Sequence, residues 1–327
     1  MQEAFRWSFA LTLVCSLSLG ALEASAQNYP VKPIRVIDAY PPGGSTDVVA
    51  RILAVKFQEN MGRTWIIDNR PGAQGIIGCE LAAKSPPDGY TLLMFTGSHA
   101  VHPSIYKNMP YDFLQAFAPI TQMTSTTNVL VVHPSVPVKS LKEVIALAKA
   151  KPGQLNYSSA GIGSTTHMAM ELLKTMARID ITHIPYKGAA PAVMDGVAGH
   201  VAMLFGPMPV VGPHAKAGRL RIIAVSTKER SRAIPDIPTV AEAGVVGYEA
   251  TNSVGIVAPA ATPREIVMKL NAEIVRILRL PDIQEKLVAM GAEPVGNTPE
   301  EFTAFIRNNI QKWASVVRAA NIPSQPW

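Results

Sequence analysis

The sequence predicts an α/β protein with two domains that face each other across a ligand cleft. Segments typical of β-strands alternate with segments typical of helices along almost the whole chain, which is the pattern of α/β folds. Glycine-rich loops follow three of these strands, at residues 41–47, 160–167 and 186–191. Ligands of open α/β sheets bind beyond the carboxyl ends of the strands, so these loops predict a binding site. The 327 residues, 48% of them apolar, suffice for two domains with substantial cores.

The first predicted domain takes residues 27–124 and returns for residues 251–327, which carry the C-terminal helices. Its strands are expected at residues 34–40, 65–68, 91–95 and 254–258, its helices at residues 48–61 and 76–83, and its last helix ends near residue 320. In the first of these helices Leu53 and Phe57 fall on one face, as a helix packed on a sheet requires, and Gly62 ends it.

The second predicted domain takes residues 125–250. Its strands are expected at residues 129–133, 155–159, 181–185, 201–205 and 221–225, with a helix at residues 141–150 and one after each glycine-rich loop. Capping boxes that open at Ser140, Thr262 and Thr298 mark helix starts in both domains.

Two crossings are expected to join the domains. The chain becomes extended and rich in Thr and Ser at residues 118–128, and a second crossing falls near residues 248–253. Two domains joined in this way can close around a ligand by hinge motion.

Residues 1–26 are predicted to be a cleaved signal peptide. Arg6 precedes a mostly apolar stretch at residues 8–22, and residues 24–26 (ASA) form a cleavage site that leaves Gln27 first. No later apolar run approaches the ~18 residues of a membrane span, so we expect a soluble periplasmic chain.

The charge balance favours a small acidic partner. The formal net charge is +6, and removal of the signal peptide, with one Arg and two Glu, raises it to +7. A basic protein attracts anions, but the basic residues are scattered and lack the aromatic interleaving of nucleic-acid binders. We therefore expect a small acidic solute, no nucleic acid, no cofactor, no metal and a monomer. Cys79, the one cysteine after residue 26, is expected to be a small core residue.

The loop at residues 41–47 (PPGGSTD) has the composition of an anion-binding turn between a strand and a helix. Its two prolines end the strand because they lack the amide proton of a ladder. Its two glycines let a ligand approach the main chain, and the small polar residues after them suit a helix start. Free N–H groups backed by the helix dipole would then point at one anion. Asp47 is expected to cap the helix or to order a bridging water.

A series of motifs runs through the chain in a characteristic order. They are YPVKPIR at residues 29–35, PPGGSTD at 41–47, NRPGA at 69–73, PDGYTLL at 87–93, NVL at 128–130, the segment 149–156, GIGSTTH at 161–167, IPYKG at 184–188 and IPTVAEAG at 237–244. In this combination the chain resembles the Bug-type extracytoplasmic solute receptors, the substrate-binding proteins of tripartite tricarboxylate transporters. The resemblance covers essentially the whole mature chain.

The resemblance implies a type II periplasmic-binding fold and a carboxylate-bearing solute. It implies that main-chain groups and waters from the first loop and from residues 161–167 hold the solute. It also implies delivery to a two-part integral membrane transporter (TctA/TctB-like). Lys187 could pair with a second carboxylate, and the ring of Tyr186 could line the cleft. The candidate ligand-binding residues are Pro42, Gly43, Gly44, Ser45, Asp47, Thr96, Ser98, Gly163, Ser164, Thr165, His167, Tyr186, Lys187 and Gly206.

Two positions depart from the pattern of the family. Where its members often carry Asp after the strand at residues 201–205, this chain has Gly206, so an amino group on the ligand would lack a partner. Where they often carry an aromatic residue near residues 251–254, this chain has Asn252 among small neighbours, which makes that wall smaller and more polar.

Other functions fit parts of the sequence less completely. Ser164 and His167 could pair as the nucleophile and base of an esterase, but no G-x-S-x-G elbow and no third triad member accompany them. The spacing of His99 and His102 suits a metal ion, although a further ligand is missing. A sensor that signals through a membrane kinase would share the fold and the pocket, so the sequence leaves that alternative open. We expect no catalytic role.

Overall fold

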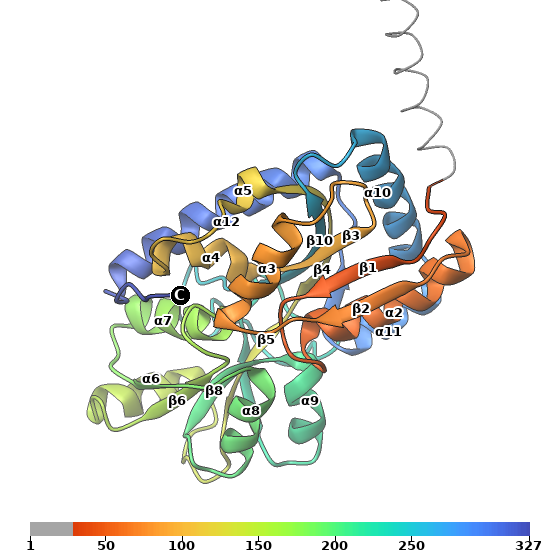
Figure 1. Ribbon diagram of the computed structural model, residues 1–327. Helices are drawn as coiled ribbons and strands as arrows, with labels where there is room; N and C mark the ends of the chain where they lie inside the picture. Colours follow the sequence, from red (N-terminus) through yellow and green to blue (C-terminus); the bar gives the residue numbers. More distant parts are fainter. Residues whose placement is uncertain (1–28) are drawn as a thin grey trace, which may run out of the picture.

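The structure, a computed structural model, describes residues 29–327. The predicted signal peptide at residues 1–26 lies outside the described residues. Figure 1 shows two lobes, each built around one β-sheet that is flanked by helices. The predicted α/β fold is confirmed. Among the described residues, no helix has the length and apolar character needed to cross a membrane.

The sheet of the first lobe has six strands in the order β11-β4-β10-β3-β1-β2. Their bounds are β1 (Ile34–Asp38), β2 (Trp65–Asn69), β3 (Thr91–Thr96), β4 (Phe117–Thr126), β10 (Asn252–Pro259) and β11 (Ala292–Pro294). β1 lies between β2 and β3 and is parallel to both, whereas β10 is antiparallel to β3 and β4. The carboxyl ends of β1, β2 and β3 therefore share one edge of the sheet.

Helices cover both faces of this sheet. They are α2 (Ser45–Met61), α3 (Ile76–Ala83), α4 (Gly97–Ile105), α5 (Phe113–Ala116), α10 (Arg264–Leu278), α11 (Pro281–Ala289) and α12 (Pro299–Ala319), with a 3-10 turn at Ala73–Gly75. On one face α2, α10 and α11 pack on the sheet, and the predicted apolar stripe of Leu53 and Phe57 lies in that core. On the other face Phe302 of α12 packs against Phe95 of β3.

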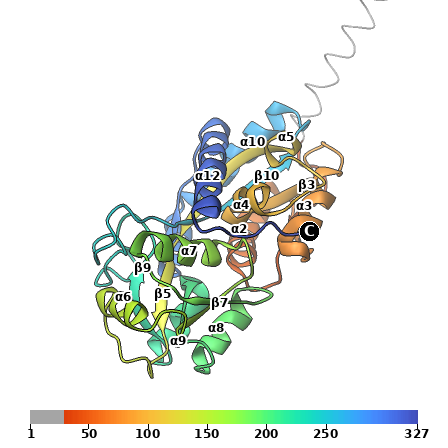
Figure 2. The same cartoon turned by 90° about the vertical axis from the view of Figure 1, so that its left-hand side faces the viewer.

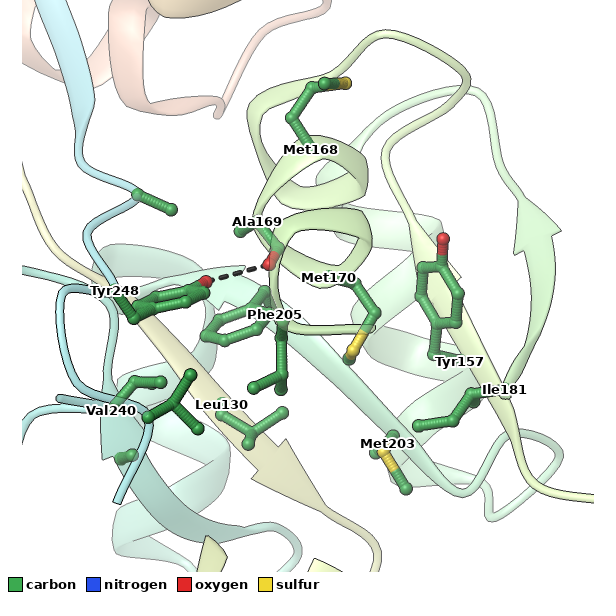
Figure 3. Close-up of a cluster of buried hydrophobic side chains, with 14 of the residues drawn as sticks. Leu130, Tyr157, Met168, Ala169, Met170, Ile181, Met203, Phe205, Val240 and Tyr248 are labelled. Atoms are coloured by element: carbon green, nitrogen blue, oxygen red, sulfur yellow. Dashed lines mark hydrogen bonds between the residues drawn. The ribbon is translucent and has the colours of Figure 1, made fainter. Parts of the chain in front are cut away.

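The sheet of the second lobe has five strands in the order β7-β6-β8-β5-β9. Its elements are β5 (Asn128–Val132), α6 (Leu141–Ala150), β6 (Asn156–Ser159), α7 (Thr165–Ala177), β7 (Thr182–Pro185), α8 (Ala189–Val197), β8 (Met203–Pro207), α9 (Met208–Lys216) and β9 (Arg221–Val225). α6 and α7 cover one face, and α8 and α9 cover the other. Figure 3 shows the core under α7, where the ring of Tyr248 stacks on Phe205 and its hydroxyl donates to Ala169 O at 2.8 Å.

The chain passes between the lobes at two neighbouring places. It leaves the first sheet at Thr127, between β4 and β5, and returns between β9 and β10. The two passages are hydrogen-bonded to each other, because Ser226 N donates to Asn128 O at 2.9 Å, and within the second passage Ala250 N donates to Ser226 O at 2.8 Å. The stretch at residues 118–128, predicted to be a crossing, is mostly strand β4, because its residues pair with β10.

α12 also links the lobes. It packs against α4 of the first lobe and α7 of the second, as Figure 2 shows. Trp313 of α12 is buried in the same apolar cluster as Val101 of α4 and Leu173 of α7. The lobes therefore share a packed seam on one side of the molecule, in addition to the two chain passages.

The three predicted capping boxes have different outcomes. The box at Thr298 is confirmed, because its hydroxyl accepts from Glu301 N and its own N–H donates to the Glu301 carboxylate. The hydroxyl of Ser140 caps α6, but the Glu143 carboxylate accepts from the amide of Lys139 rather than that of Ser140. The box at Thr262 is wrong, since α10 begins at Arg264, one residue too late for a Thr262 cap.

Candidate functional site

A cavity of about 790 Å³ lies between the two lobes. All three predicted glycine-rich loops contribute to its wall, with Gly43 and Gly44 from the first lobe and Gly161 and Gly188 from the second. Pockets for small molecules in proteins span roughly 300–1,000 Å³, so this cavity has ample room for a small solute.

Side chains of the first lobe reach the main chain of the second at the cavity wall. Gln74 Nε2 donates to Ala160 O at 3.5 Å, and the Tyr106 hydroxyl donates to Ile162 O at 3.2 Å. Gly161 approaches Gln74 so closely that a Cβ at position 161 would stand 2.0 Å from Gln74 Nε2. The lobes are therefore in contact across the cleft, and this contact requires glycine at position 161.

Helices from both lobes begin at the cavity. Residues of the first turn line it in α2 and α4 of the first lobe and in α7 and α8 of the second. The first amides of a helix have no intrahelical partner, and the helix dipole makes this end positive. α2 and α8 follow Gly44 and Gly188, which carry no capping side chain, so their first amides remain available. This arrangement suits a negatively charged ligand.

The charges on the cavity wall also favour a negatively charged ligand. Among the residues that line the cavity, Lys187 is the one with a charged side chain, and neither Asp nor Glu is present. Histidine is absent from this lining as well. An anion would therefore meet donors and a cation, whereas an ammonium group would find no carboxylate side chain on this wall.

The first loop keeps its own carboxylate away from the cavity. Asp47 Oδ2 accepts from Gly43 N at 3.0 Å, and both carboxylate oxygens accept from the Arg51 guanidinium. Burial acts to raise the pKa of Asp47, but the hydrogen bonds from Arg51, Gly43 and Asn69 outweigh it and lower the pKa below its ordinary value. Asp47 thus shapes the loop and does not line the cavity.

The second loop is held by side chains on its own helix. Thr166 Oγ1 accepts from Ala160 N at 3.0 Å, and His167 Nδ1 accepts from Gly163 N at 3.2 Å. Ser164 Oγ accepts from the main-chain N–H of His167 at 3.2 Å. Burial, with a smaller contribution from Lys174, lowers the pKa of His167 to about 4, so its imidazole is neutral near pH 7. The ring also stacks on His183, with the centroids 4.2 Å apart.

The remaining walls are formed where β3 ends and β10 begins, and by the third glycine-rich loop. Thr96, Ser98 and Asn252 line the cavity where β3 and β10 meet α4, and Thr96 Oγ1 donates to Asn252 Oδ1 at 3.1 Å. In the third glycine-rich loop, the Tyr186 hydroxyl donates to the Asp195 carboxylate, and this bond raises the pKa of Tyr186 to about 12. The neighbouring Lys187 is left on the cavity wall.

The structure brings most of the predicted site residues to this cavity. Those that line it are Pro42, Gly43, Gly44, Ser45, Thr96, Ser98, Ser164, Thr165, Tyr186 and Lys187. Asp47, Gly163, His167 and Gly206 lie off the lining. Gly206 is buried in β8, where a Cβ would meet Val211 at 2.5 Å, so it packs against α9 and is not open to a ligand. His99 and His102 lie in an aromatic layer, and residues 29–327 contain no cluster placed to hold a metal ion.

Several parts of the wall were not among the predicted site residues, and three of them stand out. Gln74, with φ of 54°, and Tyr106 both reach across the cleft. The segment Gln325, Pro326 and Trp327 also lines the cavity. Gln325 N donates to Ile105 O at 2.9 Å, which holds this segment against the end of α4. Of these, only Gln74 could have been found from the sequence, because it directly follows the motif NRPGA. Tyr106 and residues 325–327 follow no recognisable motif.

Two lobes joined by paired chain passages, with helices beginning at a cavity between them, define a solute-binding protein of the periplasmic type. The comparison with protein families gives the narrower class. The family described as the tripartite tricarboxylate transporter family receptor matches residues 49–322, so the chain belongs to that family. The resemblance seen in the motifs is therefore confirmed, and the protein is a solute-binding receptor of this transporter family.

Relatives and solved structures agree with this assignment. Protein BugT of Bordetella pertussis is 39% identical over 300 residues, which cover 91% of this chain and 92% of BugT. The structure of R. palustris Rpa4515 with adipate matches with a TM-score of 0.87 and 36% identity, and covers 91% of this chain and 100% of that one. MatC from Rhodopseudomonas palustris with bound malate matches with a TM-score of 0.81 and 29% identity over 88% of this chain and 100% of that one.

Proposed function

We propose that this receptor captures a small solute with at least one carboxylate group and presents it to the membrane subunits of a TctA/TctB-like transporter. The observation that carries the proposal is the cavity wall, where four helices begin, Lys187 is present and acidic side chains are absent from the lining. Each helix start stabilises an anion by about 0.3–1 kcal/mol at an exposed site, and by up to about 2 kcal/mol where it is partly buried.

The class of ligand follows from both the wall and the relatives. Two structural neighbours hold adipate and malate, which are dicarboxylates. In this chain one carboxylate would meet the amides after Gly44, and the ammonium of Lys187 offers a partner for a second. The proposed site residues are therefore the predicted candidates that line the cavity, together with Gln74 and Asn252.

We further infer that ligand capture uses motion of the two lobes. The proposed moving units are residues 27–124 with 251–327 and residues 125–250. The passages at Thr127 and near Ser226 and Ala250 would act as the hinge, since they are short and lie side by side. The protein would work as a monomer in the periplasm after removal of residues 1–26.

Binding without catalysis is part of the proposal. Ser164 Oγ accepts from the main-chain N–H of His167, while His167 Nδ1 accepts from Gly163 N. A serine nucleophile needs a hydrogen bond from its hydroxyl to a basic imidazole nitrogen. The arrangement of Ser164 and His167 supports a role in shaping the loop and not in an esterase reaction.

A thermal-shift screen of the chain from Gln27 onward tests the function. The screen uses adipate, malate, benzoate and citrate at pH 6.5, with lysine and sodium sulfate as controls. An acid present at 100 times its dissociation constant stabilises the fold by about 2.7 kcal/mol, so binding raises the unfolding midpoint. We expect at least one carboxylate to raise the midpoint while lysine does not. The proposal fails if no carboxylate raises the midpoint, or if lysine matches the best acid.

A further inference from the structure

A buried carboxylate lies directly behind the first glycine-rich loop. Asp38 is the last residue of β1 and has 0% exposure. Its two carboxylate oxygens each lie 2.9 Å from Thr46 Oγ1, and Oδ1 also accepts from Tyr40 N at 3.2 Å. Thr46 lies in the first turn of α2 and lines the cavity, whereas Asp38 does not. One hydroxyl therefore stands between this carboxylate and the ligand space.

The two charged groups of α2 that lie close to Asp38 form an ion pair with each other. Asp47 and Arg51 are joined by a salt bridge of 2.9 Å, so their effects on Asp38 oppose each other. On β2 Asp68 is paired with Arg35 and Arg70, which leaves no unpaired charge at that end of the strand.

The other titratable neighbours do not change charge near neutral pH. Burial raises the pKa of the Cys79 thiol of α3 to about 12 and holds the pKa of the Tyr40 hydroxyl well above its ordinary value. Burial lowers the pKa of His99 of α4 well below its ordinary value, so this ring stays neutral. For Asp38 itself burial outweighs the hydrogen bond from Thr46 and raises the pKa to about 7. Among these neighbours, Asp38 is thus the group that titrates near neutral pH.

The hydroxyl of Thr46 carries one proton and can donate once. When Asp38 is ionised, that proton is committed to the Asp38 carboxylate, which can only accept. When Asp38 is protonated, its own O–H can donate to Thr46 Oγ1, which frees the Thr46 proton for a ligand oxygen. An ionised Asp38 and a bound anion would also share the positive end of α2, and like charges at one site disfavour each other.

We propose that Asp38 is a positioning residue that couples the binding of a carboxylate to the uptake of one proton. The proton comes from solvent and adds to a carboxylate oxygen of Asp38, and Thr46 then donates its hydroxyl proton to the ligand. No other bond is made or broken. This inference rests on the proposed function and adds a condition to it: the receptor loads its ligand more tightly at acidic pH and releases it as the pH rises.

Calorimetric titration between pH 6 and pH 8.5 tests the coupling, with adipate as probe, or the acid with the largest thermal shift if adipate does not bind. The carboxyl groups of adipate, malate and benzoate are predominantly ionised throughout this range, so their own titration contributes little, and citrate is not used as the probe because its last proton still dissociates in this range. For the wild type we expect the affinity to fall about thirtyfold from pH 6 to pH 8.5, because Asp38, with a pKa of about 7 in the free protein, must be protonated when the ligand binds. At pH 8, titrations in HEPES and in Tris, which differ in ionisation enthalpy, should reveal uptake of nearly one proton per ligand.

Variants distinguish a loss of proton coupling from general damage to the binding site. Asp38→Asn keeps the shape of the side chain and donates to Thr46 as the protonated acid does, so we expect wild-type affinity at pH 6 and no pH dependence. Thr46→Ser should keep the pH dependence, and Thr46→Val should bind weakly at every pH. The control is Glu171→Gln, which changes a buried carboxylate of α7 that bonds Tyr157 away from the cavity. It should keep the wild-type profile.

The possible failures are distinguishable. Wild-type affinity that does not change with pH, or a pH dependence that persists in Asp38→Asn, overturns the coupling while leaving the proposed function intact. Loss of the pH dependence in Glu171→Gln also overturns it, because the effect would then not be specific to Asp38. If no acid binds the wild type at pH 6, the proposed function fails and the coupling fails with it.

Discussion

The two glycine-rich loops that face each other across the cavity use their hydrogen-bond donors differently. In the second lobe, the amides of Ala160, Gly161 and Gly163 are all bonded to nearby side chains, those of Thr166, Ser159 and His167. In the first lobe, Gly43 N is bonded to Asp47, and Gly44 at the start of α2 has no side chain that could cap the next amides. Similar sequences thus produce one loop whose helix start has no side-chain cap and one loop in which several amides are bonded to side chains of the same loop and helix.

We propose that this difference gives the two loops different tasks in ligand binding. The first loop offers main-chain N–H groups and the helix dipole, which recognise negative charge without regard to the rest of the ligand. The second loop offers the hydroxyls of Ser164 and Thr165, which can donate or accept and so adapt to neutral parts of a ligand. We therefore expect changes in the first loop to remove binding, and changes in the second to reduce it.

Gly44→Val should have the largest effect on binding. Gly44 has φ of −75°, and a Cβ there would meet only Pro41 O at 3.6 Å, so the backbone accepts a side chain. The branched side chain would occupy the cavity in front of the α2 amides. We expect at least a hundredfold loss of affinity in calorimetry, about 2.7 kcal/mol, with an unfolding midpoint only slightly below that of the wild type, because valine is a poorer N-cap than glycine.

Gly44→Ala is the matched control, and it should lose less affinity because one methyl group leaves part of the space open. Affinity of Gly44→Val within threefold of the wild type would contradict the assignment of charge recognition to the first loop.

A second difference between the loops is that the buried carboxyl group of Asp38 lies behind the first one. This group should make the stability of the fold depend on pH. The folded-state pKa of Asp38 is about 7, above the ordinary value of 3.8, so folding binds a proton between these values. Stability from this group is complete below about pH 4 and is lost as the pH rises to 7. From pH 5.5 to pH 8 the unfolding free energy of the wild type should therefore fall by about 2 kcal/mol relative to that of Asp38→Asn, because the contributions of the buried histidines, which rise over the same range, cancel in this difference.

Urea unfolding of the ligand-free protein at several pH values measures this loss. The difference in unfolding free energy between Asp38→Asn and wild type should therefore grow in favour of the variant as the pH rises. A difference that stays constant from pH 5.5 to pH 8 would show that Asp38 does not titrate in this range.

Ser164→Ala tests the second loop and should have a smaller effect on binding. It removes the hydroxyl that accepts from His167 N, which is the N-cap bond of α7. Loss of such a cap costs about 1 kcal/mol of stability. We expect a three- to tenfold loss of affinity, and Ser164→Thr should restore both properties. A hundredfold loss of affinity would show that the second loop contributes as much to binding as the first. It would contradict the proposed difference between the two loops.

The sequence predicts the positions of the loops well because they depend on local chemistry. Glycines precede α2 and α8, and their effects act within a few residues. The first strand was predicted to run to the prolines at residue 41, but β1 already ends at Asp38, two residues before the predicted end at residue 40. The predicted helix at residues 76–83 is also confirmed, with the same bounds as α3. α4 was missed because its sequence starts with glycine and contains Pro103, both of which are weak helix signals.

The roles of individual side chains were harder to predict. Asp47 and His167 have suitable chemistry and spacing for ligand contact, but the structure uses both to bond the amides of their own loops. That choice depends on side-chain rotamers and on burial, which no local pattern encodes. Asp38 was hidden in the same way, because it ends a run that is otherwise apolar. Its proximity to Thr46 arises only when α2 folds back along β1.

The segment at residues 325–327 forms a part of the cavity wall that belongs to neither loop. A substitution in this segment should have the smallest effect on ligand affinity. Trp327 lines the cavity with 46% of its surface exposed, and its Nε1 donates to Asn108 O at 2.7 Å. Trp327→Ala removes the ring but leaves the bond from Gln325 N to Ile105 O, which is made by the main chain. A short ligand held by the loops should not sense the change, whereas a longer ligand should lose apolar contact. We expect about a threefold loss of affinity for adipate, none for malate, and retention in Trp327→Phe. Equal losses for both acids in calorimetry would show that the segment acts on the fold of the cavity and not on the reach of the ligand.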